Sequence, residues 1–151
     1  MNRDGRNGIG FSVRYIRTDG YIDGAEYPVF TIIRSRDELK RYYDLYKDVY
    51  DFSSHAQRYS EETSSFADAM VQFTDAFFSE HYLVVVMLEE GSGSIRHQVK
   101  QIEENGDIVI HRVVPEIGTA DMAQWTILIG LNSRFKQNQF HILMTQSMSE
   151  E

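Results

Sequence analysis

The feature that most constrains the fold is an unbroken apolar run at residues 82–88, Tyr-Leu-Val-Val-Val-Met-Leu. The run has the length of a β-strand and is too short to span a bilayer. A strand with one face in water alternates apolar and polar residues, whereas a strand buried on both faces does not. We therefore expect residues 82–88 to form the central strand of a sheet.

Six further segments have the pattern of strands. In the first and fifth of them, apolar residues alternate with polar or small ones, which is the period of a half-buried strand. The third and fourth flank Asn105-Gly106, which is the strongest short signal for a hairpin in the chain. The six segments are residues 9–15, 29–33, 95–103, 107–114, 123–131 and 140–144.

Helical patterns lie between the second of these segments and the central run. Residues 35–38, Ser-Arg-Asp-Glu, form a capping box that starts a helix. A second helix is expected around residues 64–73, and a short helical turn near residues 75–80. The first helix carries a stripe at helical spacing, made of Leu39, Tyr42, Tyr43, Tyr46 and Tyr50. Core packing is the commoner role of such a stripe, and a sugar-binding or partner-binding surface is the alternative.

These patterns predict one α+β domain with a mainly antiparallel sheet of about seven strands and two inserted helices. The sheet is expected to curl toward a sandwich or a barrel. We expect the domain to cover residues 9–146, after a polar stub at residues 1–8 and before a polar tail at residues 147–151. The stub lacks the apolar core of a secretion signal, so either the protein is not exported or a leader has been removed. Of these two, we favour an exported or cell-envelope domain that has lost its leader.

Composition disfavours several classes of partner. The formal net charge is −8, whereas a nucleic-acid or anionic-membrane partner calls for a basic face. The chain has no cysteine, which excludes disulfides, thiolate catalysis and cysteine-ligated zinc. No segment is apolar for long enough to cross a bilayer. We expect neither nucleic-acid binding nor membrane insertion.

The chain also lacks the motifs of common enzyme and cofactor sites. It has no phosphate-binding loop, no dinucleotide fingerprint and no nucleophile elbow. Its five histidines form neither H-E-x-x-H nor a close pair, so we expect no metal ion and no cofactor. Trp125 falls on the apolar side of its alternating segment and is expected in the core.

Two histidines, His97 and His111, lie in the expected hairpin, and the turn decides whether they share a face. A two-residue Asn105-Gly106 turn places them on opposite faces of the sheet. A three-residue loop with a bulge shifts the register by one and places them on the same face. Both arrangements remain open at the level of the sequence.

Three stretches of the chain resemble an uncharacterised bacterial domain family. They are residues 77–86 (FFSEHYLVVV), 91–97 (GSGSIRH) and 115–125 (PEIGTADMAQW), and GSGSIRH is the most specific of them. Tyr27-Pro28 and residues 35–39 (SRDEL) fit the same family, so the resemblance covers most of the chain. The order of elements also distantly resembles the C-terminal domain of PrcB, a subunit of a protease complex. That resemblance implies association with a protease rather than catalysis.

Two loops are the candidate functional region, at residues 89–94 and 115–121. Both join buried strands, and antiparallel connectivity allows them to meet at one end of the domain; rigid sheets with variable loops often serve recognition. We therefore predict a non-catalytic module that binds a protein such as a protease. The predicted contact residues are Ser92, Ser94, Arg96, His97 and Asp121.

Two alternatives remain open. The first is a structural or assembly domain that pairs an exposed edge strand, such as residues 140–144, between chains. The second is a hydrolase that uses His97 or His111 with a carboxylate, which requires a pocket that holds both groups within hydrogen-bonding reach.

Overall fold

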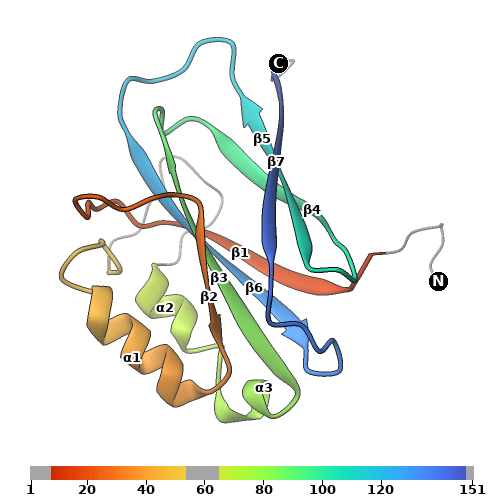
Figure 1. The fold of residues 1–151 in the computed structure, drawn as a ribbon. Coiled ribbons are helices and arrows are strands. Elements are labelled where there is room, and N and C mark those ends of the chain that lie inside the picture. Colours follow the sequence, from red (N-terminus) through yellow and green to blue (C-terminus); the bar gives the residue numbers. More distant parts are fainter. Residues whose placement is uncertain (1–7, 54–64, 149–151) are drawn as a thin grey trace.

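The computed structural model describes residues 8–53 and 65–148 of the chain. The described residues form seven strands and three short helices, arranged as two sheets with the helices on the far side of the larger sheet (Figure 1). This arrangement confirms the α+β class and the expected number of strands. The expected second helix lies partly outside the described residues, because residue 64 belongs to the undescribed segment.

The larger sheet has four antiparallel strands in the order β1-β6-β3-β2. Strand β3 (His81–Glu90) contains the long apolar run and pairs with β6 (Ala123–Asn132) and β2 (Val29–Ile33), so the prediction of a central strand is confirmed. The outer strand β1 (Phe11–Arg17) pairs with β6. Side chains on both faces of β3 are buried, which explains its unbroken apolar run. The alternation in β6 predicted a half-buried strand, but this was wrong, because Gln124 and Thr126 on its more polar side are buried as well.

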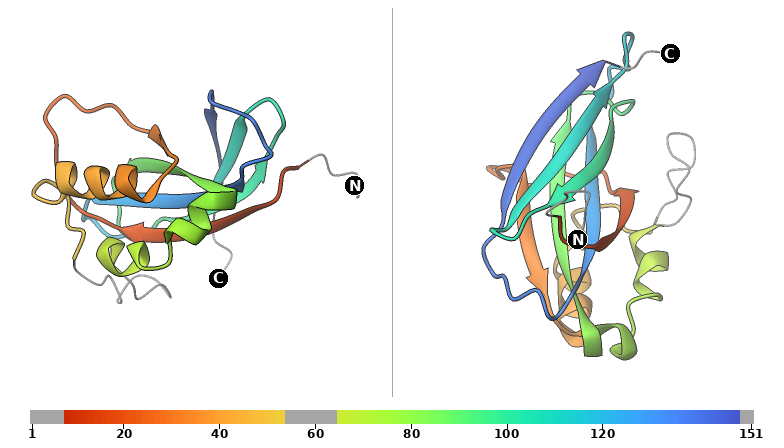
Figure 2. Two further views of the ribbon diagram at one scale, coloured as in Figure 1. Left: turned by 90° about the horizontal axis from the view of Figure 1, so that it is seen from below. Right: turned by 90° about the vertical axis from the view of Figure 1, so that its right-hand side faces the viewer.

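The smaller sheet has the order β4-β5-β7 and packs over one face of the larger sheet at a steep angle (Figure 2). Strands β4 (Arg96–Ile102) and β5 (Asp107–Val114) form the expected hairpin. Strand β7 (His141–Met148) runs parallel to β5, whereas the other strand pairs of the described residues are antiparallel, so the sheets are mainly antiparallel as predicted. The parallel direction of β7 follows from the path of the chain. After β5 the chain enters the larger sheet as β6, and it then returns to the smaller sheet as β7, which runs in the same direction as β5.

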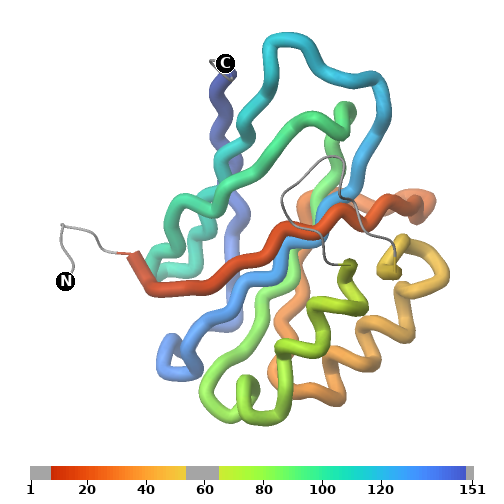
Figure 3. The backbone as a smooth tube through the Cα atoms, turned by 180° about the vertical axis from the view of Figure 1, so that it is seen from behind, coloured from red at the N-terminus to blue at the C-terminus, as the bar shows by residue number. Residues whose placement is uncertain are grey.

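The two sheets do not close into a barrel, so only the sandwich alternative remains. They approach each other at the edge formed by β1 and β4, which Figure 3 shows from behind. There the amide of Ile9 donates to the carbonyl of Ile102 at 2.7 Å, and the amide of Val99 donates to the Tyr15 hydroxyl at 2.8 Å. The core between the sheets includes Trp125, whose exposed fraction is 2%, so its expected core position is confirmed.

Three helices cover the other face of the larger sheet: α1 (Arg36–Tyr46), α2 (Phe66–Met70) and α3 (Asp75–Glu80). The Ser35 hydroxyl caps α1 by accepting a hydrogen bond from the amide of Glu38 at 3.1 Å, as the capping box predicts. The tyrosine stripe belongs to this second core, with Tyr42 and Tyr50 buried and stacked near Phe52. The core role of the stripe is therefore confirmed.

The hairpin between β4 and β5 turns through three residues rather than two. Glu103 and Asp107 are joined by a backbone hydrogen bond of 2.9 Å, and Gly106 adopts the left-handed conformation that the turn needs, with φ of 96°. A bulge at Lys100 then shifts the register once more. His97 consequently pairs with Arg112, and His111 with Gln98, which places the two histidines on opposite faces.

The ends of the domain reach slightly beyond the expected bounds. Gly8 forms an isolated bridge with Glu103, and β7 continues to Met148, past the expected domain end at residue 146 and past the expected last strand at residues 140–144. The other residues of the expected stub and tail, 1–7 and 149–151, lie outside the described residues.

Candidate functional site

The two expected recognition loops meet at one end of the molecule, where β3 and β5 end and where β4 and β6 begin. We call this region the tip and define it as residues 91–95 and 115–122. Glu89 and Glu90, which the expected first loop included, belong instead to β3 and pair with Gln124 and Ala123. The two loops are therefore short segments that project from the ends of strands in the two packed sheets.

Asp121 clamps the two loops together. Its carboxylate accepts hydrogen bonds from the amide of Gly93 at 3.2 Å and from the guanidinium of Arg17 at 3.0 Å. The Thr119 hydroxyl, Arg17 and the Gly93 amide together hold the pKa of Asp121 well below its usual range, so the clamp is charged at neutral pH. Arg17 also pairs with Asp19, which ties the clamp to the end of β1.

Hydroxyl groups form a second connection between the loops. The Ser92 hydroxyl lies 2.8 Å from the Ser94 hydroxyl and 3.0 Å from the Thr119 hydroxyl, and it accepts a hydrogen bond from the Thr119 amide at 2.9 Å. The Gly-Ser-Gly-Ser segment at residues 91–94 is thus held by partners on the facing loop. The hydrogen-bonding capacity of both serines is used largely within the tip.

Gly93 allows the close approach on which the clamp depends. A Cβ atom at this position would lie 2.4 Å from Asp121 Oδ2 and 2.5 Å from a terminal nitrogen of Arg17. Gly91, two residues earlier, has no atom within 4 Å of the corresponding position. A side chain at Gly93 would therefore disturb the clamp, whereas one at Gly91 would not, so Gly91 is a matched control for Gly93.

We predict that Gly93→Ala loosens the tip without unfolding the domain. The added methyl displaces the ends of two side chains, so the loss is local and the global free energy of unfolding falls by only about 1 kcal/mol. Thermolysin, which cleaves before apolar residues, is expected to cut faster at Ile117 and Met122. Gly91→Ala is the control and should be cleaved like the unmodified protein. Equal cleavage rates in both variants would show that the clamp does not order the loops.

Arg96 lies beside the tip and supports it from within. Its guanidinium donates to the carbonyl of Gly93 at 2.7 Å and lies over the Trp125 ring at 5.5 Å from the ring centre. Burial, with a smaller contribution from nearby Arg17, lowers the pKa of Arg96 from its ordinary value. This contact links the loop backbone to the core between the sheets.

His97, the remaining predicted contact residue, points away from the tip surface. It lies between the sheets, with Nε2 at 2.7 Å from Glu90 Oε2 and with its ring 5.8 Å from that of Trp125. The exposed fraction of its side chain is 1%, so it cannot contact a partner in this conformation. The structure therefore brings Ser92, Ser94 and Asp121 together at the surface and separates His97 from them.

Arg112 completes a buried ionic cluster with Glu90 and His97. Its guanidinium donates to both carboxylate oxygens of Glu90, at 2.8 and 2.6 Å, and also to the side chain of Gln146. Burial raises the pKa of Glu90, but hydrogen bonds from Arg112 and His97 outweigh that effect and lower the pKa to about 2. The three residues lie on β3, β4 and β5, and Gln146 adds β7, so the cluster ties the two sheets together beneath the tip.

The cluster contains the histidine–carboxylate pair that a hydrolase would need, but it has no access for a substrate. A general base must come within hydrogen-bonding reach of the reacting group, whereas the His97 side chain is enclosed. His111 lies on the outer face of β5, where its ring nitrogens contact the hydroxyls of Thr145 and Ser147 rather than a carboxylate. The geometry gives neither histidine the surroundings of a catalytic base.

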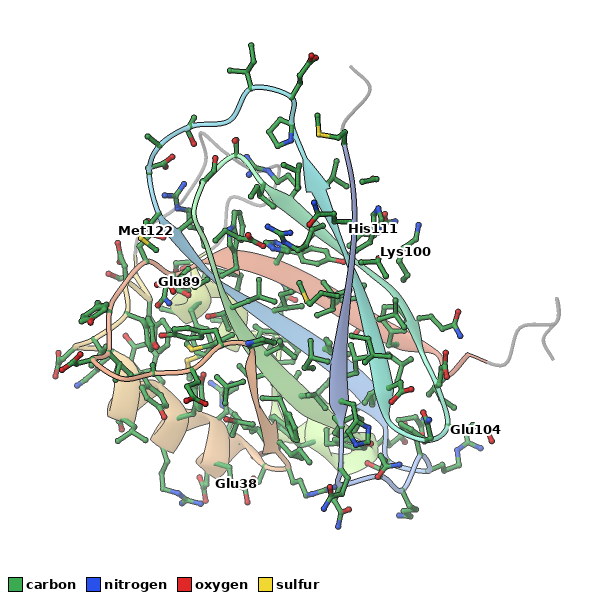
Figure 4. All side chains as sticks on the ribbon, turned by 45° about the horizontal axis from the view of Figure 1, so that its top comes forward. Glu38, Glu89, Lys100, Glu104, His111 and Met122 are labelled. Carbon is green, nitrogen blue, oxygen red and sulfur yellow. The ribbon has the colours of Figure 1, made fainter. Side chains whose placement is uncertain are left out.

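Two apolar side chains at the tip were not identified from the sequence. Ile117 is 88% exposed and Met122 is 60% exposed, although both belong to a loop whose backbone is held in place. Figure 4 shows Met122 at the tip, near the exposed Glu89, while Glu104 marks the opposite end of the molecule. In the sequence, each of these positions is marked only by an apolar residue, in a loop that has neither the periodicity of a strand nor that of a helix.

Other kinds of site find less support in the described residues. Their histidine, aspartate and glutamate side chains form no group of three or more that could hold a metal ion. An open pocket of about 570 Å³ lies at the end opposite the tip, lined by Ile9, Gly10, Glu104, Asn132, Arg134, Phe135 and Lys136. None of the described helices has the length and apolar character needed to cross a membrane.

Comparisons with known proteins add no further assignment. No family model matches the chain, and neither a curated protein nor a solved structure matches it.

Proposed function

We propose that the protein is a non-catalytic binding module whose tip docks into an apolar pocket of a protein partner. The observation that carries this proposal is the pair of exposed apolar side chains, Ile117 and Met122, on a loop that the Asp121 clamp holds in place. A preordered loop loses little conformational entropy on binding, so its exposed side chains can contribute fully to affinity. Large exposed apolar residues on such loops commonly mark contact surfaces.

The charge around the tip indicates the kind of partner. Exposed Glu89 and Glu116 flank the apolar side chains, and the whole chain carries a net charge of −8. A partner with a basic rim around its apolar pocket would therefore associate faster and with greater specificity. A protease is the partner class that the resemblance to PrcB suggests. Ser92, Ser94 and Arg96 would act by positioning the loops, and His97 by joining the sheets beneath them.

Site-specific photo-crosslinking in cells tests this proposal. A photoreactive residue replaces Ile117 in one variant and Leu45 in a control, because Leu45 is 68% exposed but lies on α1, outside the tip. We expect a discrete adduct from position 117 and none of the same mass from position 45. Adding Gly93→Ala to the position 117 variant should reduce the yield of this adduct several-fold. Adducts of the same masses and yields from both positions, unaffected by Gly93→Ala, would contradict a docking role for the tip.

A further inference from the structure

Two adjoining pockets lie at the end of the molecule opposite the tip. The first, of about 570 Å³, has the half-buried side chains of Ile9 and Phe135 in its lining, and both pack against the core between the sheets. The second, of about 390 Å³, is lined by residues at the turn between β4 and β5. Glu104 lines both, and we call the two together the base pockets. Each volume lies in the range of pockets that hold small ligands, about 300–1,000 Å³.

Hydrogen bonds hold the walls of the base pockets in place without a ligand. The amide of His141 donates to the carbonyl of Gly106 at 3.0 Å, which holds the loop between β6 and β7 against the turn between β4 and β5. The Tyr82 hydroxyl donates to the carbonyl of Phe135 at 2.8 Å, which joins the same loop to β3. A pocket formed in advance spends little of its binding free energy on ordering its walls.

Charged side chains of both signs line the base pockets, and none of them forms an ion pair. Arg134 and Lys136 line the first pocket only and Glu103 the second only, with Glu104 shared between them. The Lys136 ammonium and the Glu104 carboxylate have no ion pair or hydrogen bond with the described residues, and the Arg134 guanidinium donates only to the neutral Asn132 side chain, at 3.3 Å. The charges of both signs are therefore available to a ligand.

We propose that the base pockets bind a small zwitterion with an apolar side chain, either an amino acid or a dipeptide. The carboxylate of the ligand lies at Arg134 and Lys136, and its ammonium group lies at Glu104. Its side chain packs on Ile9 and Phe135. This site lies at the other end of the molecule from the tip and does not depend on the docking function proposed for it.

Charge selects this class of ligand over simple anions and cations. Glu104 and the net charge of −8 on the whole chain disfavour a simple anion. Arg134 and Lys136 disfavour a simple cation in the first pocket. A zwitterion has no net charge to be repelled, and each of its ends meets a side chain of opposite sign.

An NMR titration with alanyl-phenylalanine tests this proposal, with the backbone amides of Glu104 and Phe135 as reporters. We expect saturable shifts with a dissociation constant of about 1 mM or lower. The carboxamide and N-acetyl forms of the dipeptide each lack one charge and should bind at least about tenfold more weakly. Free phenylalanine should bind as tightly as the dipeptide if the ligand is an amino acid, and at least about tenfold more weakly if it is a dipeptide. No saturable shift with either zwitterion up to about 10 mM, or equal binding of the blocked forms, would overturn the proposal.

Gly10→Leu tests whether the ligand occupies the first pocket, which Gly10 lines. A Cβ atom at Gly10 has no neighbour within 4 Å, so a leucine fits there without strain and takes up ligand space. Gly91→Leu is the matched control, because its position is equally open but lies at the tip. The first variant should abolish the shifts and the second should keep them. Equal binding by the two variants would overturn the assignment to this pocket.

Lys136→Glu tests the carboxylate end of the site by a change of charge. It should weaken binding of alanyl-phenylalanine at least about tenfold, because a carboxylate then faces the carboxylate of the ligand. Lys40→Glu makes the same change at an exposed position of α1 and should bind like the unmodified protein. Unchanged binding in Lys136→Glu would overturn the proposed orientation of the ligand.

Discussion

Replacing Glu90 with glutamine is expected to lower the free energy of unfolding by about 2–3 kcal/mol. The substitution removes the buried carboxylate that Arg112 and His97 share, at 2.6 and 2.7 Å, and leaves a guanidinium without its counter-charge between the sheets. Arg112 keeps partial access to solvent, with a side-chain exposure of 24%, which holds the loss below that of a fully enclosed pair. Urea unfolding followed by Trp125 fluorescence measures the change.

Glu89→Gln is the matched control for this prediction. It makes the same chemical change one residue earlier in β3, on the opposite face of the strand, where the side chain is exposed. Surface substitutions of this kind change stability by less than about 0.5 kcal/mol. Similar losses in the two variants would show that the buried cluster contributes nothing specific.

The same cluster predicts how stability depends on pH. Folding lowers the pKa of Glu90 from 4.5 to about 2, so the folded state favours the charged carboxylate. Its contribution is complete above pH 4.5 and is lost as the pH falls from 4.5 toward 2. Across this range the unmodified protein should lose about 2 kcal/mol more stability than Glu90→Gln does. Parallel stability curves for the two proteins would contradict the assignment.

Trp125→Ala is expected to have a larger effect still, a loss of about 4 kcal/mol. The indole is 2% exposed and fills the core between the sheets, where it contacts both Arg96 and His97. A small domain has only about 5–15 kcal/mol of stability, so this variant should be close to unfolding at room temperature. Circular dichroism during urea unfolding provides the measurement, because the variant lacks the fluorescent residue.

Trp125→Phe separates packing from hydrogen bonding at this position. The indole Nε1 is buried but has no hydrogen-bond partner among the described residues, so phenylalanine forfeits no hydrogen bond. Trp125→Phe should therefore lower the free energy of unfolding by about 1–2 kcal/mol, through the loss of buried side-chain volume alone. Trp125→Asp should prevent folding, and a stable monomeric aspartate variant would contradict the core position of this residue.

Elements with strong local signals could be predicted from the sequence. The apolar run of β3, the Ser35 cap of α1 and the Asn105-Gly106 hairpin each depend on residues that are close together in the chain. The three-residue loop and the bulge at Lys100 could not be predicted from neighbouring residues, because bulge positions depend on how the strands pack. The parallel pairing of β5 with β7 was missed for a similar reason, since it depends on the crossing of β6 between sheets.

The candidate site was predictable in position but not in the roles of its residues. The contact between the loops follows from strand connectivity, and Ser92 and Asp121 do take part in it. His97 was predicted as a contact residue because it lies close to the first loop in the chain, whereas its inward orientation depends on the bulge at Lys100. Ile117 was overlooked because a single apolar residue in a loop has no periodicity to mark it.

Amide hydrogen exchange at Gly93 and Thr119 tests most directly whether the two loops form one preordered tip. Both amides donate across or within the tip, to the Asp121 carboxylate and to the Ser92 hydroxyl. Their exchange should be slowed at least about tenfold relative to unstructured peptide, and this protection should be lost in Gly93→Ala but kept in Gly91→Ala. Exchange at the rate of free peptide in the unmodified protein would mean that the loops move independently and would contradict a preordered binding tip.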